Sequence, residues 1–191
     1  MNLSEALKTR RSHRDFSGDA VGRETVEQLV YAAQGVTGEG GLRTAPSAHA
    51  LHPLHLSVSV ARITGMDVGL HKVDRDGSIS FVRSGEVQAE LEEAAIGEQP
   101  WVGTAAGVLT VSADFAGPTA AFAGQPPFGR RGPGNVYIEA GAAAQNVALQ
   151  AAESGLGCVL VAGFSDKATA AVLRLPAPFS PVLHLCFGWP A

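Results

Sequence analysis

The chain has 191 residues, of which 46% are hydrophobic and 17% charged, and its formal net charge is −4 at pH 7. This composition is globular and excludes a disordered chain, and the weak negative charge gives no support to binding of nucleic acid or a membrane surface. No apolar run reaches the roughly 20 residues of a membrane span, and Met1 leads into a polar, helical pattern without a signal peptide. We therefore expect a single domain over residues 1–191 in the cytoplasm, with reduced thiols at Cys158 and Cys186.

The first half of the chain predicts two helices, a long irregular connection and a hairpin. The helices are expected at Asn2–Arg10, with Ser4 as the capping residue, and at Arg23–Gln34. Gly35–Pro53 is rich in glycine and proline, which is typical of a functional or mobile loop. After a strand at Leu54–Ala61, the turn Asp74-Arg75-Asp76-Gly77 between the runs Leu70–Val73 and Ser78–Val82 is the clearest hairpin signal.

The second half surrounds one long, alanine-rich helix with shorter elements. They are expected, in order, as the helix Val87–Ile96, the strand Ala105–Ser112, an irregular stretch over Ala116–Gly134, the long helix Val136–Ser154, the strand Cys158–Ala162, the helix Asp166–Leu173 and the strand Val182–Phe187. The long helix is apolar around most of its circumference, so it must be covered either by its own chain or by a second copy in a homodimer. This mixture of elements favours an α+β fold with a mainly antiparallel central sheet flanked by helices.

The first candidate site is Arg10-Arg11-Ser12-His13-Arg14, directly after the first helix. Three guanidinium groups and a hydroxyl can hold a phosphate through charge-assisted hydrogen bonds. The same residues also fit a solvated basic patch at a helix C-terminus, where cations complement the helix dipole. The spacing alone leaves both interpretations open.

The second candidate is Pro46-Ser47-Ala48-His49-Ala50 in the long connection, whose small residues let the backbone approach a planar ligand closely. His49, His52 and His55 alternate, but no carboxylate or cysteine lies nearby in the sequence to complete a metal site. We expect these histidines to line the rim of a pocket or to lie half-exposed along a strand, and we expect no metal.

Two weaker candidates follow. Glu139, Gln145 and Asn146 place polar groups on the apolar helix, where they either contact a ligand or cap neighbouring loop backbone. Gly163 in Val161-Ala162-Gly163-Phe164 follows a strand and can present a backbone N–H group to a ligand. The sequence has no dinucleotide-binding glycine motif, no P-loop and no nucleophile elbow, and neither cysteine has the electropositive setting of a nucleophile.

Taken in order, these segments resemble the nitroreductase family of flavin enzymes, most closely its SagB-type dehydrogenase branch. The resemblance runs through nearly the whole chain. It rests on Arg11-Ser12-His13-Arg14-Asp15-Phe16, Ala45-Pro46-Ser47-Ala48, Pro53-Leu54-His55-Leu56, Gly97-Glu98-Gln99-Pro100-Trp101-Val102, Phe128-Gly129-Arg130-Arg131, Glu139-Ala140-Gly141, Ala144-Gln145-Asn146, Gly155-Leu156-Gly157 and Gly188-Trp189-Pro190.

The resemblance implies a nitroreductase-like fold built as an intertwined homodimer with FMN at the subunit interface. The matching residues Arg10, Arg11, Ser12 and Arg14 would hold the phosphate and ribityl chain of FMN. Pro46, Ser47, Ala48 and His49 would lie against the flavin ring, often from the partner subunit, and Ala162 and Gly163 would face the ring near its reactive nitrogen. No catalytic side chain is then required, because the flavin carries the chemistry.

The chain departs from the family's pattern at several positions. Azoline-oxidising SagB members carry a lysine–tyrosine pair where Pro127 and Phe128 stand here, and phenylalanine can neither donate nor accept a proton. Ala142 replaces a histidine of that branch, Ala50 replaces an asparagine of the classical nitroreductases, and the basic C-terminal extension of those enzymes does not follow Ala191. We therefore expect NAD(P)H-driven reduction of nitro, quinone or similar small acceptors. The alternatives are a SagB-type dehydrogenase of peptide natural-product biosynthesis and a flavin-binding protein with little turnover.

Overall fold

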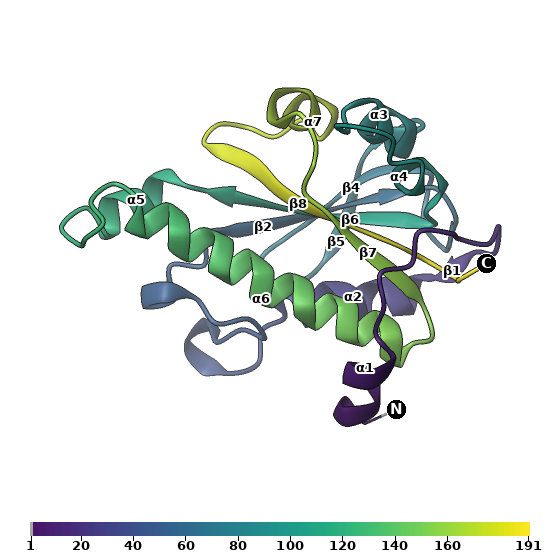
Figure 1. Cartoon of the computed structure of the whole chain (residues 1–191), viewed down its shortest axis with the longest axis horizontal. Coiled ribbons are helices and arrows are strands. Elements are labelled where there is room, and N and C mark those ends of the chain that lie inside the picture. Colours follow the sequence, from purple (N-terminus) through teal and green to yellow (C-terminus); the bar gives the residue numbers. More distant parts are fainter. Residues whose placement is uncertain (1) are drawn as a thin grey trace.

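The computed structural model describes residues 2–191, and its centre is a six-stranded sheet (Figure 1). The strands lie in the order β5-β4-β2-β6-β8-β7, and every neighbouring pair is antiparallel. Their bounds are β2 (Leu54–Val60), β4 (Gly69–Val73), β5 (Ile79–Ser84), β6 (Gly107–Asp114), β7 (Gly157–Val161) and β8 (Phe179–Gly188). A separate parallel pair joins β1 (Val21–Gly22) to β3 (Ile63–Thr64). The expected α+β fold with a mainly antiparallel sheet is confirmed.

Helices cover both faces of this sheet. They are α1 (Leu3–Thr9), α2 (Arg23–Gln34), α3 (Val87–Glu93), α4 (Trp101–Thr104), α5 (Ala116–Ala121), α6 (Arg131–Glu153) and α7 (Asp166–Val172), with short 3₁₀ turns at Glu39–Gly41 and Ala48–Ala50. Helices α2 and α6 lie on one face, and α3, α4 and α7 lie on the other (Figure 1). Each face has its own buried apolar cluster. Within residues 2–191, no helix has the length and apolar character needed to cross a membrane.

Two predicted elements form where the sequence signal was strong. Helix α2 has the expected bounds and buries one apolar stripe, which includes Val26, Leu29 and Val30. The predicted hairpin is β4–β5, where the N–H of Asp74 donates to the carbonyl of Ser78 at 2.9 Å and Gly77 takes a φ of +90°. A positive φ is the conformation that favours glycine at such a turn.

Two details of the predicted elements were wrong. Asn2, not Ser4, caps α1, because its side chain accepts from the N–H of Glu5 in a reciprocal capping box. The stretch Ala116–Gly134 was expected to be irregular, yet it contains α5 and the first turn of α6. A Cβ at Gly132 would collide with the carbonyl oxygen of Pro118 in α5, so this glycine permits close helix packing. Pro133 is tolerated there because first-turn N–H groups lack intrahelical acceptors.

Candidate functional site

The arginine-rich segment after α1 lies along the open edge of the sheet. Ser12 forms a parallel bridge with Cys158 of β7, the outermost strand, and the N–H of His13 donates to the carbonyl of Cys158 at 3.1 Å. A Cβ at Gly157 would lie only 2.8 Å from the Cβ of His13. Glycine at the start of β7 therefore lets the segment approach the strand.

Most of the predicted phosphate-binding side chains of this segment have no competing partner. Within residues 2–191, the guanidinium groups of Arg10 and Arg14 and the hydroxyl of Ser12 make no hydrogen bond or ion pair. Arg14 instead lies over the Trp101 ring, with its guanidinium carbon 5.3 Å from the ring centre. Arg11 differs, because its terminal nitrogen donates to the carbonyls of Lys8 and Arg10, both at 2.8 Å. Three groups remain available for an anion, and this donor set fits a phosphate.

The end of β7 lies along the same edge and is held by the loop before α4. The carbonyl of Gly163 accepts from the N–H of Ile96 at 2.8 Å and from the side-chain amide of Gln99 at 2.7 Å. Within the described residues its own N–H has no acceptor, and Ala162 beside it is exposed. The five residue-to-residue steps from Cys158 to Gly163 span roughly 16 Å of extended chain. The structure thus brings the arginine segment and the strand end to one edge.

The loop Pro46–His49 lies elsewhere in the chain's fold, against α5 and α6. The His49 ring packs on Phe122 with a centroid distance of 4.7 Å, and the Ser47 hydroxyl accepts from the N–H of His52 at 2.8 Å. His49 takes a φ of +54°, a left-handed conformation that non-glycine residues rarely adopt. Within one chain, this loop and the arginine segment are not brought together: the loop contacts the first half of α6, whereas the segment lies past its last turn.

The polar residues on α6 anchor this loop. The side-chain amide of Asn146 donates to the carbonyl of Thr44 at 3.2 Å. Glu139 lines the same small cavity as Ala48 and Leu51, and within residues 2–191 its buried Oε1 has no hydrogen-bond partner. Glu139 is buried, and burial raises the pKa of its carboxyl, although the Ser47 hydroxyl opposes that effect. Gln145 is exposed. Of the two roles considered for these residues, Asn146 caps the backbone of the neighbouring loop.

Neither cysteine is a candidate nucleophile. Both thiols are free and buried in the sheet, and burial raises the pKa of Cys158 to about 12 and that of Cys186 further. A thiol in such surroundings stays protonated and unreactive. The prediction from sequence is confirmed on this point.

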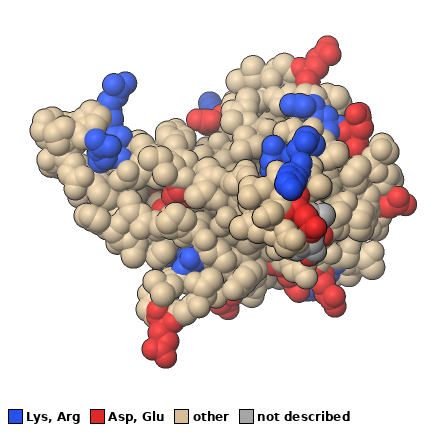
Figure 2. Space-filling model, turned by 60° about the horizontal axis from the view of Figure 1, so that its bottom comes forward, with Lys and Arg blue, Asp and Glu red and all other residues tan. Residues whose placement is uncertain are grey.

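Part of α6 remains uncovered by its own chain. Tyr137 and Ile138 are 59% and 71% exposed, although the helix was expected to need cover on all sides. Figure 2 shows this side of the molecule, where the surface between basic groups at its two ends is mostly uncharged. At one end of α6, Arg130 directly precedes the helix and Arg131 is its first residue, and both are exposed. Arg11 and Arg14 are exposed past the other end of the helix.

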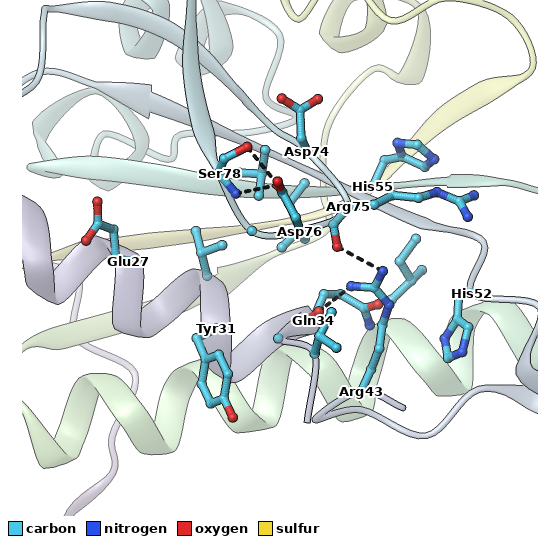
Figure 3. A pocket seen from close by; sticks show the side chains of 17 residues that line it. Glu27, Tyr31, Gln34, Arg43, His52, His55, Asp74, Arg75, Asp76 and Ser78 are labelled. Carbon is cyan, nitrogen blue, oxygen red and sulfur yellow. Dashed lines mark hydrogen bonds between the residues drawn. The ribbon is translucent and has the colours of Figure 1, made fainter. Parts of the chain in front are cut away.

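A pocket between α2 and the β4–β5 turn was not predicted as a site. It has a volume of about 420 Å³, and Figure 3 shows the side chains that line it. His52 and His55 are among them, so the expectation of histidines at a pocket rim is confirmed for these two. Its other lining residues come from separate parts of the sequence, and only the alternating histidines gave a signal.

Comparison with known proteins identifies the family to which the fold belongs. A model described as the nitroreductase family matches residues 7–189, so the chain belongs to the nitroreductase family. The family expected from the motifs is confirmed.

Particular relatives agree with this assignment. A protein of Methanocaldococcus jannaschii, named a putative nitroreductase, is 34% identical over 176 residues, which cover 92% of this chain and 85% of the relative. A crystal structure from Ralstonia eutropha JMP134 with the same description has a TM-score of 0.82 at 26% identity and covers 100% of this chain and 84% of that one. The NfrA1 nitroreductase of Bacillus subtilis shares the fold, with a TM-score of 0.70 at 22% identity over 100% of this chain and 67% of that one.

Proposed function

We propose that this chain is an FMN-dependent oxidoreductase that takes electrons from NAD(P)H and passes them to nitro, quinone or similar small acceptors. It would act as a single domain over residues 1–191 in the cytoplasm. The observation that carries the proposal is the arrangement along the open edge of β7. Unpaired Arg10, Ser12 and Arg14 lie at one end of this edge, and the free N–H of Gly163 lies at the other.

FMN, rather than FAD, is the flavin that suits this edge. One segment offers phosphate-binding groups, and the sequence has no dinucleotide-binding motif for a second phosphate. Arg10, Ser12 and Arg14 would hold the phosphate and ribityl chain, with Arg11 nearby, and Ala162 and Gly163 would face the ring. When bound, FMN supplies the acceptance of a hydride and the onward release of electrons.

The protein's own groups have the simpler tasks of binding and orientation. The two arginines offer charge-assisted hydrogen bonds to a phosphate, and the Gly163 N–H offers a donor at a fixed position because its carbonyl is tied to Ile96 and Gln99. Exposed Ala162 adds no bulky side chain beside that donor. Since no side-chain base is needed for hydride transfer, this minimal site is sufficient for a reductase.

The site would be completed by a second copy of the chain in an intertwined homodimer. Pro46, Ser47, Ala48 and His49 lie near the opposite end of α6 from the arginine segment, so they would reach a flavin held by the partner. The side chains of Tyr137 and Ile138 support such an interface. In the single chain both leave apolar surface of α6 in contact with water, and a partner subunit would cover it.

A second candidate is a SagB-type dehydrogenase of peptide natural-product biosynthesis. The motif resemblance to that branch favours it, but the turn before α6 carries Pro127 and a 70% exposed Phe128, which offer no group for proton transfer. A third is a flavin-binding protein with little turnover, consistent with the same missing groups. We favour the reductase because it needs no proton-transfer side chain.

Steady-state turnover tests the proposal. The purified protein, incubated with excess FMN, is mixed with NADH or NADPH and 1,4-benzoquinone, and nicotinamide oxidation is followed by absorbance. We expect turnover that requires both protein and quinone and falls in Arg14→Ala but not in Arg23→Ala, which removes an exposed arginine at the start of α2. Bound flavin that neither nicotinamide reduces would contradict the reductase and favour the non-turnover alternative.

A further inference from the structure

The pocket between α2 and the β4–β5 turn is separate from the proposed flavin site. It lies against the last turns of α2, the start of β2 and the turn Asp74–Ser78 (Figure 3). Its lining includes the apolar side chains of Val30, Leu54 and Val73. None of the residues assigned to flavin lines it, so an inference about this pocket does not rest on the proposed function.

The acidic side chains that line the pocket are already engaged. Each has a partner of its own: Glu27 with Arg23 at 2.8 Å, Asp74 with Lys72 at 3.2 Å, and Asp76 with the N–H and hydroxyl of Ser78 at 2.9 and 2.7 Å. None of these contacts involves an arginine of the pocket. Glu27 and Asp74 are each paired with a cation, whereas the bonds from Ser78 fix the Asp76 carboxylate and leave its charge in place.

The positive charges of the pocket belong to Arg43 and Arg75, and neither is paired with a carboxylate within residues 2–191. Arg43 is held rigidly, because it donates to the backbone carbonyls of Gln34 at 2.5 Å and of Arg75 at 3.0 Å. Carbonyl oxygens fix its position without neutralising it. The side chain of Arg75 makes no hydrogen bond, and its charge acts on His52 and His55.

Unsatisfied polar groups gather in the same wall. Gln34 is only 7% exposed, and its side-chain nitrogen has no acceptor; Arg43 Nε and His52 Nδ1 are also buried without partners. Figure 3 shows Arg43, Arg75, His52 and His55 together at one end of the pocket. Burial, followed by the neighbouring arginines, lowers the pKa of His52, and burial and Arg75 lower that of His55. Both imidazoles are therefore neutral near pH 7, and the arginines carry the charge.

We propose that this pocket binds a small organic carboxylate with an apolar body. The carboxylate would lie at the end formed by Arg43 and Arg75, where a planar pair of oxygens matches guanidinium and amide donors. The apolar body would lie over Val30, Leu54 and Val73. A volume of about 420 Å³ is within the range of small-molecule sites.

Benzoate is a suitable probe, with benzamide as its uncharged counterpart. We expect benzoate to cause saturable shifts of the backbone amides of Val36 and Gly77, two lining residues, in NMR spectra of the ¹⁵N-labelled full chain. Benzamide and inorganic phosphate should each bind at least ten-fold more weakly. The variant Arg75→Glu should lower benzoate affinity at least ten-fold, because it reverses a charge at the end of the pocket where the carboxylate would lie.

Two further variants separate binding from folding. Lys167→Glu makes the same charge change on α7, on the opposite face of the sheet, and should leave benzoate affinity within two-fold. Gln34→Leu removes the unpartnered amide and should weaken benzoate several-fold without lowering the melting temperature. No saturable shift, equal binding of benzamide or phosphate, or unchanged affinity in Arg75→Glu would overturn the proposal. A failure to bind FMN would leave all of these results unaffected.

Discussion

The guanidinium carbon of Arg14 lies 5.3 Å from the centre of the Trp101 ring, so a residue next to the first helix is oriented by one in α4. Cation–π contacts of this kind contribute about 0.5–1 kcal/mol at exposed sites. The loop that leads into α4 also holds the carbonyl of Gly163 through Ile96 and Gln99. One short region therefore positions both ends of the proposed flavin site.

Replacing Arg14 should weaken FMN binding. A charge-assisted contact to a phosphate contributes roughly 1.5–3 kcal/mol, so Arg14→Ala should raise the dissociation constant about ten-fold or more. Trp101→Leu should raise it only about two- to five-fold, because it removes the orienting contact alone. Quenching of flavin fluorescence during titration measures both dissociation constants, with Arg23→Ala as the matched control. Equal affinity in Arg14→Ala and wild type would place the phosphate elsewhere.

A charge on the exposed face of α6 should separate the proposed dimer. Ile138 is 71% exposed in the single chain, so Ile138→Asp costs the monomer little, yet it would bury a carboxylate in the interface. We expect light scattering at micromolar concentration to report a dimer for wild type and a monomer for Ile138→Asp. A monomeric wild type would rule out both the dimer and an interfacial flavin.

Glu139 should make the protein less stable as the pH rises. Its pKa is higher in the folded than in the unfolded chain, because burial disfavours the carboxylate. Its stabilising contribution is complete below the unfolded pKa and is lost as the pH rises through the folded pKa. Glu139→Gln removes this dependence and should gain stability relative to wild type between pH 4 and pH 8 in urea unfolding. A constant difference between the two proteins across this range would refute the assignment.

Azoline oxidation should be slow. Removing a proton from carbon benefits from a general base by about 10²–10⁴-fold, and Pro127 and Phe128 offer none. Wild type should therefore oxidise an azoline peptide poorly, and the double variant Pro127→Lys, Phe128→Tyr should do so faster, with quinone reduction as the internal control. Efficient azoline oxidation by wild type would favour the SagB-type alternative.

Local sequence signals predicted the elements whose form depends on nearby residues. The apolar stripe of α2 and the Asp74–Gly77 turn are local, and both were placed correctly. The start of α6 was missed because Gly132 and Pro133 resemble loop residues, whereas the glycine serves close packing against Pro118. That contact depends on the tertiary fold and has no local signature.

The candidate site was predictable only in part for the same reason. The motifs identified the arginine segment and the end of β7, but not that Arg11 caps the end of α1 or that the Pro46–His49 loop lies apart in the single chain. The pocket at Arg43 and Arg75 had no motif, because its lining comes from α2, the long connection, β2 and the β4–β5 turn. Only folding brings these segments together.

Identification of the bound flavin tests the central claim most directly. The purified protein is incubated with excess FMN and FAD together, freed of unbound flavin by gel filtration, and denatured so that the released flavin can be separated by chromatography. We predict a yellow protein that releases FMN at about one equivalent per chain, with the amount sharply reduced in Arg14→Ala. Release of FAD, or a colourless protein that retains no flavin, would contradict the account.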